Sequence, residues 1–206
     1  AYTGQHCAEH SWPEGHNGPT TRFFLPDNAD GGEARPAYFM RIAYRFDSSF
    51  HPGDLDRSVG VKGFSIGADD DNADANTPCD GTNWYSASAQ FVGWGPSQKP
   101  EANDGFLWVG HLYSYNPYPE LAEPLVGTLD VSDPRVGDEP YRFSSHGDPF
   151  QYLGFDEWHT NEVGLYLNRP GHLDGEARFW IDGVLQSRIV GMGYRDIEEL
   201  LPTNMN

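Results

Sequence analysis

Apolar and polar positions alternate with a period of two along much of this chain, which predicts β-strands rather than helices. The clearest example is the stretch 104–116, DGFLWVGHLYSYN. Both of its faces are rich in aromatic side chains, whereas a purely structural strand has one apolar and one plain polar face. One face ends in His111, Tyr113 and Tyr115, which can exchange protons and stack on sugar rings. We therefore interpret this strand as the floor of a binding cleft. The alternative is that these are ordinary half-buried strand tyrosines.

The same alternation predicts further strands and one β-hairpin. Asp182-Gly183 is the preferred two-residue type I′ turn, so the segments on either side of it should pair as a hairpin. Residues 1–36 read as an irregular segment, and residues 37–206 as one domain. The Pro- and acid-rich stretch 117–148 reads as a long loop around one strand. Besides 104–116, the predicted strands are 22–25, 37–46, 60–67, 83–92, 125–131, 158–168, 176–182 and 184–189.

Several predicted strands carry a polar or aromatic face opposite their core face. In 37–46 the arginines lie opposite a face of Tyr, Met, Ile and Phe, and guanidinium groups suit carboxylates and sugar hydroxyls. Strand 83–92 has a polar face headed by a tryptophan, and 176–182 directs an arginine and a tryptophan away from the core. A solvated outer face is the alternative for each. With His111, the candidate sugar-binding residues are Arg41, Arg45, Trp84, Ser88, Gln90, Arg178 and Trp180.

The charge of the chain excludes some partners. Thirteen Lys and Arg face 31 Asp and Glu, giving a formal net charge of −18, and Lys62 and Lys99 are the only lysines. Nucleic acids and anionic membrane surfaces require basic patches, so neither is an expected partner. No apolar run is long enough for a transmembrane helix, and we expect no membrane insertion. Because the chain begins at Ala1 without Met, we expect a processed, secreted protein.

Two cysteines and an acidic loop bear on stability. In a secreted chain, Cys7 and Cys79 are expected to form one disulfide, with two free thiols as the alternative. In the acidic loop 68–81, Asp70, Asn72 and Asp74 alternate as calcium ligands do. The loop lacks the central glycine and closing glutamate of an EF-hand, so a solvated loop is slightly favoured over a structural calcium site. We expect no cofactor to be required.

The segment 158–185, WHTNEVGLYLNRPGHLDGEARFWIDGVL, resembles the late strand, turn and hairpin of polysaccharide lyase family 14, and the downstream GYRD also fits. Upstream, YFMRIAYRF resembles the early arginine-bearing strand of that family. The stretches GVKGFSIG, WYSAS and YSY resemble its lysine, Trp-Ser-Ala-Arg and Tyr-x-Tyr stretches. The resemblance covers roughly residues 37 to 201. It implies an all-β fold, a β-sandwich jelly roll of two antiparallel sheets with long acidic and Pro/Gly-rich loops.

The resemblance also implies β-elimination on uronic-acid polysaccharides such as alginate or glucuronan. This reaction needs a neutralised carboxylate, a base for the C5 proton and an acid for the leaving O4 oxygen. Position by position, the implied catalytic residues are Lys62, Ser86, Tyr113 and Tyr115. The family arginine falls on Ser88, and Arg41 or Arg45 could replace it from a neighbouring strand.

Other functions remain open alongside a secreted lyase. A glycan-binding or extracellular structural protein could use the same scaffold, because a fold does not fix a function. A glycoside hydrolase ranks last, because no strand face carries a convincing pair of glutamates. The chain stops before the last strands of the family, and the resulting open sheet edge would favour self-association. The expected partner is a uronic-acid polysaccharide.

Overall fold

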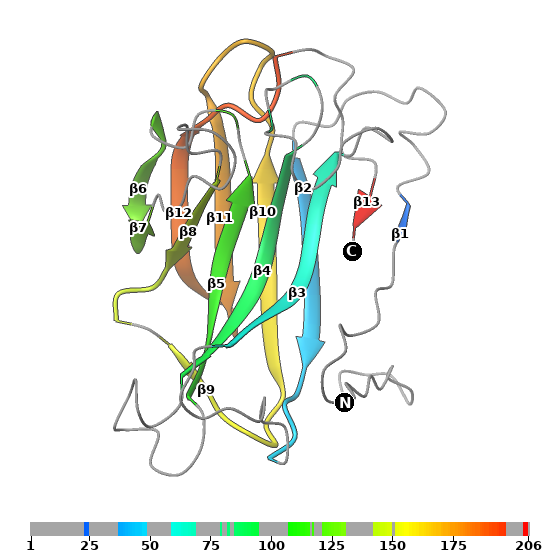
Figure 1. The fold of residues 1–206 in the computed structure, drawn as a ribbon, viewed down its shortest axis with the longest axis vertical. Helices are drawn as coiled ribbons and strands as arrows, with labels where there is room; N and C mark the ends of the chain where they lie inside the picture. Colours follow the sequence, from blue (N-terminus) through cyan, green and yellow to red (C-terminus); the bar gives the residue numbers. More distant parts are fainter. Residues whose placement is uncertain are drawn as a thin grey trace.

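The structure, a computed structural model, describes residues 23–24, 37–48, 59–68, 79, 82, 85–94, 107–115, 117, 121–130, 142–149, 151–196 and 204–205. These residues form two antiparallel sheets that pack face to face (Figure 1). The first, sheet A, has the order β1-β13-β3-β4-β5-β8-β7, with β9 paired to β5. The second, sheet B, has the order β2-β10-β11-β12-β6. The predicted all-β sandwich is confirmed.

Most predicted strands are found within a few residues of their predicted bounds, but the range 125–131 is divided in two, and 142–146, 152–153 and 204–205 were not predicted as strands. In sheet A the strands are β1 (Phe23–Phe24), β3 (Val59–Ala68), β4 (Tyr85–Trp94), β5 (Leu107–Tyr115), β7 (Thr128–Asp130), β8 (Arg142–His146), β9 (Tyr152–Leu153) and β13 (Asn204–Met205). In sheet B they are β2 (Ala37–Tyr44), β6 (Glu123–Val126), β10 (His159–Tyr166), β11 (Gly175–Ile181) and β12 (Val184–Met192). In the described part of the chain, no helix is long and apolar enough to cross a membrane.

The core lies between the sheets and is built from the inward positions of each strand. Ala87 and Ala89 of β4 and Val163 and Leu165 of β10 are fully buried in one apolar cluster. Phe179 of β11 is also fully buried there, as its alternation with Arg178 and Trp180 predicts. Burial of a large apolar side chain stabilises the fold by about 1.5–3 kcal/mol. The buried apolar residues of each strand therefore determine which of its faces points outward and can contact a ligand.

The predicted strand 125–131 is divided between the two sheets. Its first half, β6, pairs with β12 in sheet B, and its second half, β7, pairs with β8 in sheet A. Gly127 joins them with a φ of 77°, and a Cβ there would lie 2.3 Å from the His146 carbonyl oxygen. Only glycine fits this crossing, because other residues have neither the space nor the preference for positive φ. Alternation alone could not reveal that the chain changes sheets here.

Two polar contacts fasten the segment that carries the family resemblance. In the first, the Asp182 lock, His159 Nδ1 lies 2.8 Å from Asp182 Oδ2, and Thr160 N donates to Asp182 Oδ1 at 2.7 Å. Asp182 and Gly183 have φ values of 50° and 78°, as the predicted type I′ turn requires. Partial burial opposes ionisation of Asp182, but hydrogen bonds from His159 and Thr160 hold its pKa below the usual range.

The second contact, the Asn168 lock, joins the end of the β10 segment to the chain after β12. The fully buried Asn168 side chain accepts hydrogen bonds from Tyr194 N at 2.8 Å and Arg195 N at 3.1 Å. Its Nδ2 donates to the carbonyl oxygens of Arg195, Arg169 and His172 at 2.7–2.9 Å. One amide thereby satisfies several backbone groups that would otherwise be buried without partners.

The end of the chain contributes to sheet A. Asn204 and Met205 of β13 pair with Gly67 and Ile66 of β3, and β1 pairs with β13 on the other side. Part of the β3 edge of sheet A is therefore covered (Figure 1).

Candidate functional site

The outer face of β4 and β5 collects most of the polar residues that the sequence singled out. On β4, Ala87 and Ala89 point into the core, so the alternate residues from Ser86 to Gln90 point outward. On β5, Leu112 and Ser114 are fully buried, which turns His111, Tyr113 and Tyr115 outward. On β4 the predicted separation of a polar face from Ala87 and Ala89 is confirmed, and on β5 His111, Tyr113 and Tyr115 share one face as the alternation predicts.

The register of β4 and β5 brings the two polar sets together in pairs. Ser86 lies opposite Tyr115, Ser88 opposite Tyr113, and Gln90 opposite His111. Side chains directly opposite each other on antiparallel strands have Cβ atoms roughly 4.5–5.5 Å apart. These six residues thus form one continuous surface, which we call the tyrosine face. The backbone of Lys62 on β3 pairs with Gln90, which places position 62 in the next strand of the same ladder.

Two phenol groups lie at the centre of the tyrosine face. The Tyr113 hydroxyl donates to the Tyr115 hydroxyl at 3.5 Å, and the two rings meet edge to face with centroids 5.2 Å apart. Ser86 is the residue opposite Tyr115 on β4. The structure therefore brings together three of the four residues for which the resemblance implied catalysis, and places the backbone of the fourth one strand further on.

Ser88 differs from its neighbours on the tyrosine face because it is nearly buried. Its side chain is 8% exposed, and its hydroxyl donates to the Tyr113 carbonyl oxygen at 3.0 Å. Gln90 Nε2 donates weakly to the same hydroxyl at 3.5 Å. Ser88 therefore holds β4 against β5. It supplies no positive charge at the position where the resembled family carries arginine.

His111 extends the tyrosine face as a neutral group. Burial, with the nearby His146 adding to it, lowers the pKa of His111 to about 4. Its ring centroid lies 6.2 Å from that of Tyr113. Its Nε2 atom is buried and has no hydrogen-bond partner among the described residues. At neutral pH this imidazole can donate or accept a hydrogen bond but carries no charge.

Three candidate sugar-binding residues lie on the opposite side of the molecule. Arg41 belongs to β2, and Arg178 and Trp180 belong to β11, all on the outer face of sheet B. The core and two sheets separate them from the tyrosine face. The hypothesis that Arg41 replaces the family arginine beside the tyrosines is therefore wrong, because Arg41 lies in the other sheet and approaches Glu162 at 3.8 Å. Arg45 directly follows β2 and belongs to the same side of the sandwich.

A strand that the sequence did not predict contributes to the same ladder. β8 pairs with β5 so that Ser144 lies opposite Tyr113, and the backbone of Arg142 lies opposite that of Tyr115. The alternation in 142–146 is short and mixes serine with phenylalanine, so it is a weak strand signal. Among arginines, Arg142 holds the position in the strand register closest to the tyrosine pair.

Some candidates lie outside the described residues: Trp84, Cys7 and the calcium-like set Asp70, Asn72 and Asp74. Cys79, the expected partner of Cys7, is described and is 4% exposed. The described residues contain no cluster of three or more His, Cys, Asp or Glu side chains able to hold a metal ion.

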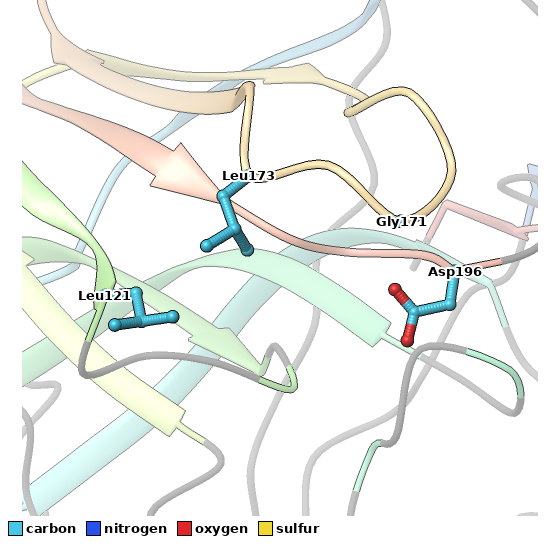
Figure 2. Close-up of a pocket in the computed structure, with 4 residues that line it drawn as sticks. All are labelled: Leu121, Gly171, Leu173 and Asp196. Carbon is cyan, nitrogen blue, oxygen red and sulfur yellow. The ribbon is translucent and has the colours of Figure 1, made fainter.

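A small pocket of about 220 Å³ opens elsewhere on the molecule (Figure 2). Leu121 and Leu173 face its interior, with Gly171 and Asp196 completing the lining. None of these four residues belongs to the tyrosine face.

No protein-family model and no curated protein sequence matches the chain. Solved structures do match. The alginate lyase vAL-1 from Chlorella virus superposes with a TM-score of 0.52 and 18% identity, over 82% of this chain and 60% of that one. The alginate lyase Aly36B superposes with a TM-score of 0.53 and 15% identity, over 84% of this chain and 59% of that one.

This chain has the polysaccharide-lyase-like jelly-roll fold. It spans about three fifths of the length of those two lyases. At such low identity the likeness establishes the scaffold alone, so the activity has to be argued from the tyrosine face.

Proposed function

We propose that this protein is a secreted polysaccharide lyase that cleaves uronic-acid glycans by β-elimination on the tyrosine face. The observation that carries the proposal is the contact between the Tyr113 and Tyr115 hydroxyls, with Ser86 opposite Tyr115 and position 62 a lysine on the neighbouring strand. Two adjacent phenol groups can act on one sugar unit, with one taking the C5 proton and the other protonating the leaving oxygen. A β-elimination needs such a pair of proton-transfer groups.

The reaction can be written for this geometry. One tyrosine, as its phenolate, takes the C5 proton of a uronate, and the electrons of the C5–H bond form a C4=C5 double bond. The C4–O4 bond breaks, and the departing O4 oxygen takes a proton from the hydroxyl of the partner tyrosine, which becomes a phenolate. Transfer of a proton from the first tyrosine to the second then restores the starting state. The products are a new reducing end and an unsaturated uronate.

The C5 proton is removable only if the substrate carboxylate is neutralised. Lys62 is the first candidate for this charge, with Gln90 opposite it in the ladder and Ser86 opposite Tyr115 as hydrogen-bond donors. Ser88 cannot provide a guanidinium, and Arg41 lies in the other sheet. Arg142, whose backbone pairs with that of Tyr115, is the arginine to test as a replacement. A neutral His111 adds a hydrogen-bonding group without repelling or attracting the carboxylate.

The decisive experiment follows absorbance of the unsaturated product near the ultraviolet cut-off while the protein is mixed with alginate, glucuronan and other polyuronates. Wild type should give a rising signal on one of them. Lys62→Met, Tyr113→Phe and Tyr115→Phe should each reduce the rate at least about 100-fold, since general acid–base groups contribute on that scale. Leu125→Ala, on the exposed edge of sheet B, is the matched control that should keep full activity.

A second candidate function is glycan binding without catalysis, and the observation that favours it is Ser88 in place of an arginine. The same variants separate the two. A flat signal from folded wild type on every polyuronate, together with retained glycan binding, would replace the lyase proposal by the binding protein.

The extracellular setting, a Cys7–Cys79 disulfide and a calcium ion at Asp70, Asn72 and Asp74 belong to the proposal as well. Support comes from the two cysteines and the acidic loop of the sequence. Mass spectrometry of the unreduced protein tests the disulfide. Repeating the lyase assay and a thermal melt with calcium and then with a chelator tests the ion.

A further inference from the structure

Three aromatic rings gather on the outer face of sheet B, on the opposite side of the sandwich from the tyrosine face. Phe39 of β2 is 48% exposed, which is unusual for a phenylalanine in the middle of a strand. Its ring meets the ring of Tyr166 of β10 edge to face at a centroid distance of 5.4 Å. On its other side the ring of Trp180 of β11 lies 6.4 Å away, tilted by 40°. We call these three rings the aromatic platform.

A glycine beneath the rings fixes their positions. Gly164 lies directly opposite Phe39 in the β2–β10 ladder and opposite Arg178 in the β10–β11 ladder. A Cβ at Gly164 would lie 2.7 Å from Phe39 Cε1 and 3.2 Å from Trp180 Cζ3. The Phe39 and Trp180 rings therefore lie down over the bare backbone of β10. Such an arrangement offers ring faces to a ligand instead of upright ring edges.

Guanidinium groups border the platform and are held in place. The Arg178 guanidinium stacks over the Tyr166 ring, with Cζ 4.6 Å from the centroid. Glu176 accepts hydrogen bonds from Arg178 Nε and from Arg188 Nε and Nη2, the last two at 2.8 and 3.1 Å. Within the described residues, Arg178 donates one of its five guanidinium N–H groups, that of Nε, to Glu176. The remaining donors lie at the edge of the rings.

This face is close to neutral in a strongly acidic chain. The outer face of sheet B carries Arg41, Arg178 and Arg188 against Glu123, Glu162 and Glu176, a local sum of 3 − 3 = 0. The chain as a whole carries −18. A polyanion is repelled by most of such a molecule and is tolerated where fixed cations stand beside apolar rings.

We infer that the aromatic platform is a second binding site for an acidic polysaccharide, separate from the face where cleavage is proposed. The apolar side of a sugar ring would stack on Phe39 and Trp180, while Arg178 donates to a neighbouring carboxylate or hydroxyl. Three rings suit one or two sugar units. They are few for a stable dimer of this chain, which would bury about 800 Å² per partner. The choice of an acidic glycan rests on the proposed function.

The test measures binding to a soluble polyuronate in a Tyr113→Phe/Tyr115→Phe background, so that cleavage cannot destroy the ligand. Adding Phe39→Ala and Trp180→Ala should weaken retention in affinity electrophoresis by about 30-fold, because the two stacked rings together contribute about 2 kcal/mol. Arg178→Gln keeps every ring and should weaken binding to the polyuronate but not to a neutral glucan. Leu125→Ala, on the same sheet but outside the platform, should bind like its parent. Urea unfolding checks that each variant is folded.

The outcomes separate this inference from the proposed lyase. In the wild-type background, Phe39→Ala/Trp180→Ala should leave turnover of short oligouronates unchanged while binding of long chains weakens. Equal retention of the platform variant and the Leu125→Ala control would overturn the inference, whatever the lyase assay shows. A change in sedimentation from dimer to monomer on mutating the platform would also overturn it, since it identifies the rings as an interface between copies. Absence of lyase activity with platform-dependent binding would remove the proposed function and keep the second site.

Discussion

The tyrosine face and the two polar locks use polar side chains in opposite ways. In the Asn168 lock one buried amide makes hydrogen bonds of 2.7–3.1 Å to five backbone atoms. In the Asp182 lock the contacts from His159 and Thr160 N are equally short. On the tyrosine face the hydroxyl pair is 3.5 Å apart, and His111 Nε2 has no partner among the described residues. The locks use their hydrogen-bonding capacity within the fold, whereas on the tyrosine face the His111 Nε2 atom has capacity that the described residues leave unused.

This contrast bears on which residues carry the resemblance to the lyase family. The stretches that carry the resemblance best, Trp-His-Thr, Leu-Asn, Asp-Gly and Gly-Tyr-Arg-Asp, contain the residues of the two locks. These residues fasten a hairpin and a loop of the jelly roll. The proposed chemistry depends on the tyrosine face, where the stretches of resemblance are short and Ser88 stands at the position of the family arginine. Likeness in the locks therefore predicts the fold much better than the activity.

If the comparison is correct, the largest loss of stability should come from the Asn168 lock. Asn168→Ala removes an amide that satisfies buried backbone groups, and we expect the free energy of unfolding to fall by about 3–5 kcal/mol. Asn168→Asp is the matched comparison: it keeps the acceptor for Tyr194 N and Arg195 N, but it replaces the donors by an oxygen that faces three carbonyl oxygens and adds a buried charge when ionised. Urea unfolding measures both. A cost below about 1 kcal/mol for Asn168→Ala would mean that the lock is dispensable.

The next largest effect is the pH dependence of stability that His111 of the tyrosine face should cause. Burial lowers the pKa of His111 to about 4 in the folded state, from the 6.5 that is usual for an exposed histidine. Between these values the unfolded chain binds a proton that the folded chain does not, so stability should fall as pH drops from about 6.5 to 4. His111→Gln should remove this part of the acid sensitivity, on the order of 2 kcal/mol at pH 4. Unfolding curves at pH 7 and pH 4 provide the measurement, and parallel pH profiles of wild type and variant would contradict it.

A smaller effect is expected from the partly exposed Asp182 lock. Asp182→Asn keeps a residue that tolerates the positive φ of this turn and removes the charge, at a cost of about 1 kcal/mol after solvent screening. The pKa of Asp182 is lowered by folding. Its contribution should therefore be complete above about pH 4, near the unfolded value, and disappear as pH falls through the folded pKa. The difference in melting temperature between variant and wild type should narrow below pH 4; a constant gap would exclude the charge as the cause.

The smallest effect on stability should come from the tyrosine pair. Tyr115→Phe removes one partly buried hydroxyl with a 3.5 Å contact, so the free energy of unfolding should change by no more than about 0.5 kcal/mol. The same change should abolish lyase turnover. Thermal melts and the absorbance assay on one preparation compare the two effects. A large loss of stability would place Tyr115 with the locks instead of with the proposed chemistry.

The sequence predicted where the strands lie along the chain better than it predicted which strands pair with each other. Alternation assigned the inward and outward sides of β2, β4, β5 and β11, because burial imposes a period of two on each strand. It could not show which sheet each strand joins. Arg178 and Trp180 were placed correctly on an outward face, yet that face belongs to sheet B and not to the sheet with the tyrosines. Pairing of Ser86 with Tyr115 depends on a ladder between residues 29 positions apart, which no local pattern encodes.

Two further misses have local causes. β8 was read as loop because Pro-rich sequence precedes it and its five residues carry two serines in succession. The break between β6 and β7 was missed because a single glycine within LVGTLDV does not by itself mark a change of sheet. Cys7 and the set Asp70, Asn72 and Asp74 lie outside the described residues, whereas Cys79 is described.

The crossing at Gly127 has a consequence for how the molecule opens. β6 is held by sheet B and β7 by sheet A, with a single residue between them. Neither sheet can slide past the other without straining the β6–β7 connection at Gly127. The hydroxyl groups of Ser145 and Ser187 add a buried contact of 2.6 Å between the two sheets. The backbone amides of β7 and β12 should therefore exchange with deuterium in one shared opening event. A polysaccharide pulled along either outer surface would load both sheets together.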